Sequence, residues 1–277
     1  MRKTGIMLGT GAAVLLLGAA VLILGGRKPF QDLSAADMVS ATVRLTPPDR
    51  TVQIVELKEL ADYLEDVVIY REDNSFREYS GQGVVFNVTM SDGTQTEVMA
   101  YNPFLVLDGV GYRTKYEPCE ALSQYANSLL EREDTVLVME EPPALAVVSD
   151  MTSHQALQGS YSWQRIDQNG TSEGIQACGG HPLGYQKELQ PALETTDGVA
   201  VLRFMEEPDE ILSVRRWSDA HWGEPSAEGE EVAVNGYEIA LKPGGYIYEV
   251  QAGWDTDSGY GGTASYFFYI NLTDLTE

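Results

Sequence analysis

The chain is poor in basic residues, cysteine and histidine. Its 277 residues include 18 Lys and Arg against 42 Asp and Glu, with two Cys and three His. So negative a surface repels nucleic acid and anionic lipid. Two cysteines are too few for a disulfide-rich scaffold. Cys119 and Cys178 either form one disulfide between two domains or remain buried thiols, and we favour the thiols.

Sequence motifs of common enzymes and metal sites are also missing. None of the six lysines follows Ser or Thr by three positions, which excludes the Ser-x-x-Lys pair of penicillin-interacting enzymes. There is no G-x-S-x-G, P-loop, G-x-G-x-x-G or Cys-x-x-Cys motif. Cys178 and His181 supply two ligands where structural zinc needs four, and residues 255–259 begin like a calcium loop without completing it. We therefore expect no metal, no cofactor and no catalytic activity.

The first long feature is an apolar run, residues 5–26, without one charged side chain. As a helix it reaches roughly 33 Å, enough to cross a hydrocarbon core of about 30 Å. Its end resembles no small-x-small cleavage site, which favours an uncleaved anchor over a signal peptide. We expect a single-pass protein of the cell membrane with its bulk extracytoplasmic. Gly5, Gly9 and Ala13 form a small-residue row on which two anchors can dimerise, although such residues are common in any anchor.

The rest of the chain has the composition of folded domains. Beyond residue 26 it holds 42 acidic and 16 basic residues, while the chain is 43% hydrophobic and 9% aromatic, enough to form a core. Charges and a Pro pair at 131–143 indicate a connector. We predict an anchor at 1–29, a domain at 30–133, a linker at 134–143 and a second domain at 144–277.

The first domain is predicted to be α+β with an antiparallel sheet. Helical spacing marks 57–67, and Pro118 opens a second helix with an apolar stripe. Strands are expected at 39–45 and 67–70. Asp92-Gly93 predicts a tight hairpin between 83–90 and 94–101, and Asp108-Gly109 predicts another between 104–107 and 112–114.

The second domain is predicted to be an all-β sandwich. Strands separated by Gly, Asp and Pro clusters are expected at 160–166, 199–205, 211–217, 237–241, 246–254 and 263–272. Residues 241–246, Leu-Lys-Pro-Gly-Gly-Tyr, are similar to the turn before strand F of immunoglobulin-like and fibronectin-type domains, which makes Tyr246 a candidate corner tyrosine.

Two stretches carry a further resemblance. Residues 101–104 (Tyr-Asn-Pro-Phe) and 109–126 (GVGYRTKYEPCEALSQYA) resemble uncharacterised extracytoplasmic domains of low-GC Gram-positive membrane proteins. Some of these accompany a region that looks like a β-lactam-sensing zinc-peptidase receptor. The H-E-x-x-H signature of that peptidase is absent here, so the resemblance implies a relative of the extracellular part, without an activity to transfer.

Two clusters are candidate binding surfaces, because they combine cations with aromatic rings that stack on sugars or acidic groups. The first consists of Tyr112, Arg113, Lys115, Tyr116 and Glu117. The second consists of Arg215, Arg216, Trp217, Asp219, His221 and Trp222. In each case the competing interpretation, which we favour, is that the rings pack in a core and the charges pair locally.

The sequence thus predicts a non-catalytic binding or sensory module at the cell surface. Candidate partners are cell-wall polymer, a peptide or another membrane protein. Two alternatives remain: an enzyme acting on wall material through two carboxylates, which requires a cleft, and a structural spacer, which requires an exposed apolar patch.

Overall fold

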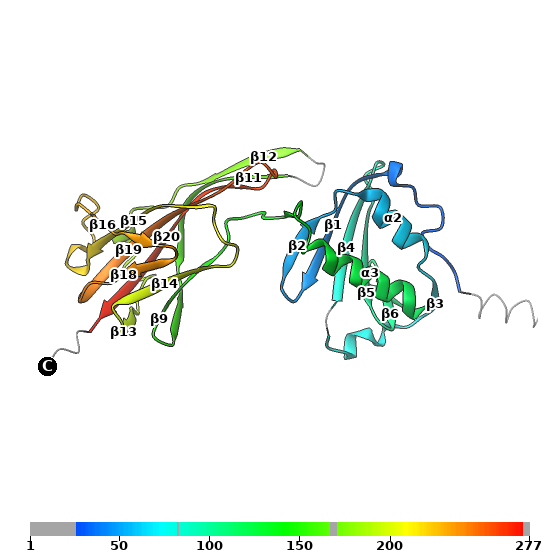
Figure 1. Cartoon of the computed structure of the whole chain (residues 1–277), viewed down its shortest axis with the longest axis horizontal. Coiled ribbons are helices and arrows are strands. Elements are labelled where there is room, and N and C mark those ends of the chain that lie inside the picture. Colours follow the sequence, from blue (N-terminus) through cyan, green and yellow to red (C-terminus); the bar gives the residue numbers. More distant parts are fainter. Residues whose placement is uncertain (1–25, 82, 167–170, 274–277) are drawn as a thin grey trace, which may run out of the picture. The chain divides into compact units, whose positions relative to one another are not determined.

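The computed structural model describes residues 26–81, 83–166 and 171–273. They form two compact units, unit 1 up to Val138 and unit 2 from Met139 (Figure 1). The division falls inside the stretch predicted as a linker. The predicted anchor lies outside the described residues except for its last positions, 26–29, and no helix of the described part is long and apolar enough to cross a membrane.

Unit 1 is built on one antiparallel sheet of eight strands in the order β3-β7-β6-β5-β4-β1-β2-β8. Both predicted hairpins are confirmed. Gly93 has φ +86°, and Asp108 and Gly109 have φ +49° and +81°, the positive angles that tight hairpins require. The strands are β1 (Met38–Thr46), β2 (Arg50–Gln53), β3 (Ile69–Glu72), β4 (Gly83–Met90), β5 (Gln95–Tyr101), β6 (Phe104–Leu107), β7 (Val110–Thr114) and β8 (Val136–Leu137).

Two helices, α2 (Leu57–Glu65) and α3 (Tyr116–Leu129), cover one face of this sheet (Figure 1). Leu60 and Leu64 of α2 and Leu122 of α3 are fully buried in one core with alternate residues of the central strands, such as Val43 and Phe86. The helical spacing in the sequence predicted these buried positions. The predicted α+β organisation therefore describes unit 1.

The opposite face of the sheet is covered only locally. The short helix η1 (Ala35–Asp37), which precedes β1, packs against α2, whereas the short helix η2 (Asn74–Glu78) lies over β6 and β7 on this face. Phe104 of β6 is fully buried there against Phe76, with ring centroids 6.4 Å apart. Gly111 of β7 allows the close approach, because a Cβ at this position would lie 2.6 Å from the Asp73 carbonyl oxygen.

Unit 2 consists of two sheets around a common core, as predicted for a sandwich. The five-stranded sheet has the order β10-β9-β14-β18-β17; the other has the order β12-β11-β20-β19-β15-β16, with β13 parallel to the end of β20. Trp163, Val147 and Tyr248, from strands of both sheets, share one buried cluster. The strands are β9 (Leu145–Ser149), β10 (Thr152–Gln155), β11 (Leu157–Ile166), β12 (Ser172–Ala177), β13 (Leu193–Thr195), β14 (Val199–Phe204), β15 (Glu210–Ser218), β16 (Glu230–Glu231), β17 (Val234–Asn235), β18 (Glu238–Ala240), β19 (Gly244–Trp254) and β20 (Gly261–Leu272).

The outer face of the larger sheet carries a second, smaller core. Loops with the short helices η3 (Pro182–Gly184) and η4 (Asp219–His221) pack on Trp217, Ile247 and Phe267. Strand β19 is therefore buried on both faces at Ile247 and Tyr248.

The two cysteines are free thiols in different units. Cys119 is buried in unit 1, where its Sγ donates to the Phe104 carbonyl at 3.4 Å, and burial raises its pKa to about 12. Cys178 is exposed, so the expectation of two buried thiols is wrong for this residue. It lies just beyond the end of β12, outside the core.

Candidate functional site

The first predicted cluster does not form one surface. Tyr112 packs partly into the unit 1 core, whereas Arg113, on the other face of β7, forms an ion pair with Asp73 at 2.8 Å and lies 4.4 Å above the Phe104 ring. Lys115, Tyr116 and Glu117 are exposed at the start of α3. Lys115 pairs with Glu117 at 3.7 Å. Strand alternation thus separates the side chains that the sequence places together.

The second predicted cluster is held together by contacts among its own members and neighbours. Trp217 is buried, with 4% of its surface exposed, and its indole N–H donates to the Ala227 carbonyl at 3.1 Å. Trp222 packs edge-on against Tyr269 at 5.5 Å. The Tyr269 hydroxyl donates to Asp219 at 3.0 Å, and burial together with this bond raises its pKa to about 12. These side chains belong to the smaller core or contact it. This agrees with the interpretation that the rings of the second cluster pack internally.

The charged members of that cluster are also engaged. Arg216 Nε lies 3.0 Å from Glu230, which also contacts Lys242 at 3.1 Å. Both cations face the Tyr246 ring, at 5.6 and 5.4 Å from its centroid. Lys242 and Arg216 lower the pKa of the Glu230 carboxyl. His221 contacts Glu224 of its own turn at 2.9 Å, and Arg215 is exposed on β15 opposite Glu231.

Two adjoining surface hollows in unit 1 are the better candidate. They share the walls Tyr79, Ser80, Gly81 and Tyr101, and their volumes are about 420 and 480 Å³, within the ordinary range of ligand sites. Gly81 allows the chain to pass close to Tyr101, because a Cβ there would lie 3.0 Å from the Tyr101 hydroxyl. We call these the polar hollow and the apolar hollow.

The polar hollow lies between the end of β5 and one side of α3. Its remaining lining is Val84, Ala100, Asn102, Glu120, Ser123, Gln124 and Asn127. The Asn102 amide donates to Glu120 Oε2 at 3.1 Å, and Gln124 contacts Glu120 Oε1 at 3.4 Å. Two amides thus fix one carboxylate, and Asn102 Oδ1 is buried without a partner among the described residues. Hydroxyls, amides and one carboxylate provide hydrogen bonds for a polar, uncharged ligand.

The apolar hollow lies on the sheet face opposite the long helices. Its remaining lining is Thr46, Phe76, Arg77, Gly83, Val85 and Met99. Tyr79 stands between the two hollows with 59% of its surface exposed, and its ring lies 5.6 Å from that of Phe104. An exposed ring over a buried one is a rigid stacking surface.

The segment that carries η2 is fixed by Asp73. Its Oδ1 accepts from the Ser75 N–H at 3.0 Å and its Oδ2 accepts from Arg113 Nε at 2.8 Å. The bonds from Ser75, and then Arg113, lower the pKa of Asp73 from 3.8 to about 2. The ionised carboxylate therefore holds one end of the segment that forms both hollows.

The lowered pKa of Asp73 makes the stability of residues 73–81 depend on pH. Since the folded pKa is depressed, the stabilisation by Asp73 is complete above pH 3.8 and is lost as the pH falls toward 2. We expect the protection of residues 73–81 against amide exchange, relative to the intrinsic exchange rate at each pH, to fall in this window, and Asp73→Asn to abolish the change. Exchange measured by mass spectrometry, with Asp92→Asn in the β4–β5 turn as control, tests this. A wild-type Asp73 carboxyl that titrates near pH 3.8 by NMR would contradict it.

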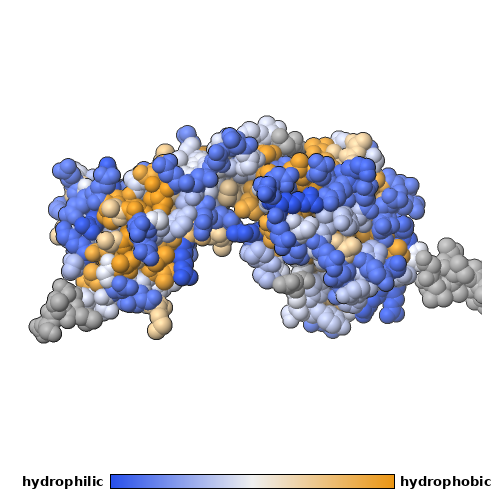
Figure 2. Space-filling model, in the orientation of Figure 1, coloured by the Kyte–Doolittle hydropathy of each residue, from blue (hydrophilic) through white to orange (hydrophobic). Residues whose placement is uncertain are grey.

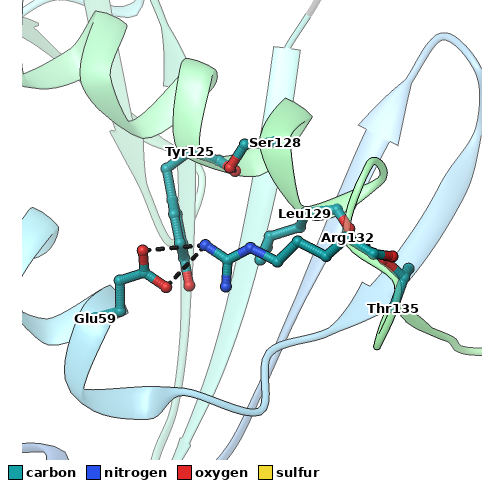
Figure 3. A network of polar contacts seen from close by, with 6 residues as sticks. All are labelled: Glu59, Tyr125, Ser128, Leu129, Arg132 and Thr135. Atoms are coloured by element: carbon teal, nitrogen blue, oxygen red, sulfur yellow. Dashed lines mark hydrogen bonds and ion pairs between the residues drawn. The ribbon is translucent and has the colours of Figure 1, made fainter.

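A separate polar network joins the two helices (Figure 3). Arg132 Nη2 contacts both carboxylate oxygens of Glu59 at 3.0 and 2.9 Å, and its guanidinium lies 5.8 Å from the Tyr125 ring. Thr135 donates to the Arg132 carbonyl at 2.7 Å. Burial raises the pKa of Tyr125, whose hydroxyl has no partner among the described residues. The network fixes the C-terminal end of α3 against α2. None of its residues lines either hollow.

Sequence reasoning did not identify the residues of the hollows. Tyr101 and Asn102 stood in the stretch that carried the resemblance, but nothing marked them as a site, and residues 73–81 carried no motif. Within the described residues no group of three or more His, Cys, Asp or Glu is placed to hold a metal ion. The chain matches no family model, and comparison with curated proteins and with solved structures yields no match.

Proposed function

We propose that this chain is a membrane-anchored, extracytoplasmic binding or sensory module without catalytic activity, and that its ligand binds in the two hollows of unit 1. The observation that carries the proposal is the pairing of a polar and an apolar hollow across the exposed ring of Tyr79. The apolar run at 5–26 and the resemblance to extracytoplasmic domains of Gram-positive membrane proteins support the location.

The chemistry of the hollows favours a ligand with both hydroxyl or amide groups and apolar parts. Peptidoglycan fragments, in which N-acetylated sugars carry short peptides, have this character. The 42 acidic residues and the carboxylate of Glu120 disfavour polyanions such as teichoic acids. We therefore propose wall glycopeptide as the ligand class, with a short peptide as the second candidate.

The test uses the full chain in lipid nanodiscs. Titration with soluble disaccharide-peptide fragments of peptidoglycan, followed by calorimetry, is expected to show saturable binding. Tyr79→Ala and Tyr101→Ala should each weaken it roughly tenfold or more, as for other central aromatic contacts. Tyr161→Ala, a partly buried residue of unit 2, is the matched control. Absence of saturable binding, or equal loss in all three variants, would overturn the proposal.

Two other candidate functions predict different results in this experiment. A wall-acting enzyme would convert the fragments to products that mass spectrometry detects. A structural partner protein would bind none of them and would use an apolar surface; Figure 2 shows hydrophobic residues gathered on the visible face of unit 2, and the exposed apolar side chains of that unit include Met205 and Leu212. For unit 2 we propose an immunoglobulin-like arrangement, which its two sheets, antiparallel except for β13, support. The Tyr246 ring faces Arg216 and Lys242, so its contacts do not add support as a corner tyrosine.

A further inference from the structure

The chain is fixed to unit 1 at the point where the apolar run ends. Arg27 N–H donates to the Ile69 carbonyl at 2.8 Å, and Ile69 N–H donates to the Arg27 carbonyl at 2.9 Å. Strand β3 is the edge of the sheet, so this short pairing extends the sheet by one bridge. Lys28 Nζ contacts Asp66 at 3.4 Å. The residues that follow the run are thus part of the fold.

Gly26, the last residue of the run, is itself closely packed. It has φ +64°, and a Cβ there would lie 2.5 Å from Val68 and 2.9 Å from the Tyr70 ring. The next residue, Arg27, lies with its guanidinium 5.3 Å from the ring of Tyr112. No spacer separates residues 5–26 from the edge of unit 1. If the run spans a membrane, β3 lies at the bilayer surface.

The surface beside this exit combines aromatic rings with cations. Tyr70 and Tyr116 are 38% and 59% exposed, and the exposed cations are Arg27, Lys28, Arg71 and Lys115. Lys115 is next to β3, because its N–H donates to the Val68 carbonyl at 3.1 Å. Tyrosine and basic residues are enriched at the membrane interface. We call these six residues the juxtamembrane patch.

The charge of the patch also suits a bilayer. The acidic neighbours Asp66 and Glu117 form ion pairs with Lys28 and Lys115, and Glu72 is exposed at the end of β3. With Glu65, exposed beside Asp66, the four cations balance four carboxylates, whereas acidic residues prevail over basic ones by 42 to 18 in the whole chain. Most of the surface is repelled by anionic lipid headgroups, and this part of it is not.

We propose that the juxtamembrane patch docks on the bilayer that residues 5–26 enter, with Tyr70 and Tyr116 at headgroup depth. The inference rests on the proposed membrane anchoring. The proposed partner of the patch is a lipid surface, because the patch adjoins the apolar run without intervening chain.

The test is tryptophan quenching by lipid in the full chain. All four tryptophans of the sequence lie beyond residue 160, in unit 2. The emission added by Tyr116→Trp is therefore obtained by subtracting the parent protein. In vesicles of phosphatidylcholine and phosphatidylglycerol, brominated acyl chains are expected to lower this added emission roughly twofold, as for side chains at the headgroup–acyl boundary. Tyr70→Trp is the second reporter, should the first variant fold poorly.

Val39→Trp is the matched control. Val39 is 48% exposed at the start of β1, whose register with β4 places it near Met90. The exit lies toward the opposite end of the sheet, roughly 20 Å away along a strand. This reporter is expected to keep its emission in brominated vesicles.

The experiment distinguishes a failure of the proposed anchoring from a failure of the proposed docking. If alkaline carbonate removes the parent chain from vesicles, the anchoring in the proposed function is wrong, and the docking inference falls with it. If the chain is retained but Trp emission at 116 and 70 matches that at 39, docking alone is overturned.

Discussion

A Gly262→Ala chain is expected to lose about 3–5 kcal/mol of the free energy of unfolding of unit 2. Gly262 lies on β20 between β11 and β19, paired with Trp163 and Trp254. Its φ is +140°, and an added Cβ would overlap the Ser162 carbonyl oxygen and lie 3.0 Å from Trp163 Cα. Alanine is therefore strained in its backbone and also separates two central strands.

Tryptophan fluorescence in denaturant measures this effect selectively, since all four tryptophans belong to unit 2. Gly174→Ala on β12 is the control, because a Cβ there meets nothing within 4 Å and its φ is ordinary. We expect it to change the stability by less than about 1 kcal/mol. An equal loss in the two variants would refute the steric explanation.

Phe104→Ala is expected to destabilise unit 1 by about 3–5 kcal/mol. The ring is fully buried and lies between Arg113, at 4.4 Å, and the rings of Phe76 and Tyr79. Its removal leaves a cavity beneath the segment that forms both hollows. Ligand binding should therefore weaken even under conditions in which the unit remains folded.

Hydrogen exchange by mass spectrometry tests this prediction, because it resolves residues 73–81 from the helices. Tyr116→Ala, which removes a ring of which 59% is exposed, is the control and should leave exchange in that segment unchanged. Unaltered protection of residues 73–81 in Phe104→Ala would show that Phe104 does not support them.

Local chemistry made much of unit 1 predictable. Asp92-Gly93 and Asp108-Gly109 set positive backbone angles at two turns, and these turns determine the register of β4 with β5 and of β6 with β7. Strands β2, β9, β10, β12, β13, β16 and β17 were not predicted. Most of them are short. Strands β2, β10 and β12 pair with the strand just before them in the chain, whereas β9 also pairs with β14 and β13 pairs with β20, partners that no local pattern shows.

The candidate site was less predictable, because it depends on contacts across the chain. Asn102 and Glu120 meet only when β5 and α3 are side by side, and Tyr79 becomes a wall of both hollows because η2 is fixed by Asp73 and Arg113. The two clusters of cations and aromatic rings were predicted as binding surfaces because of their composition. The same composition allows their rings and charges to pack against one another and their neighbours. Their rings and charges find partners in the same turn, on a neighbouring strand or, for Trp222 and Asp219, at Tyr269 of β20.

The pairing of Arg27 with β3 has a mechanical consequence for the proposed sensor. Because Gly26 packs against Val68 and Tyr70 and Arg27 pairs with Ile69, a movement of the proposed anchor would be passed directly to the edge strand. Asn102, at the wall of the polar hollow, donates to the Tyr116 carbonyl at 3.5 Å, close to the same edge. In the proposed sensor, a change in the orientation of the anchor and a change in the occupancy of the polar hollow would therefore act on neighbouring residues of the same sheet edge.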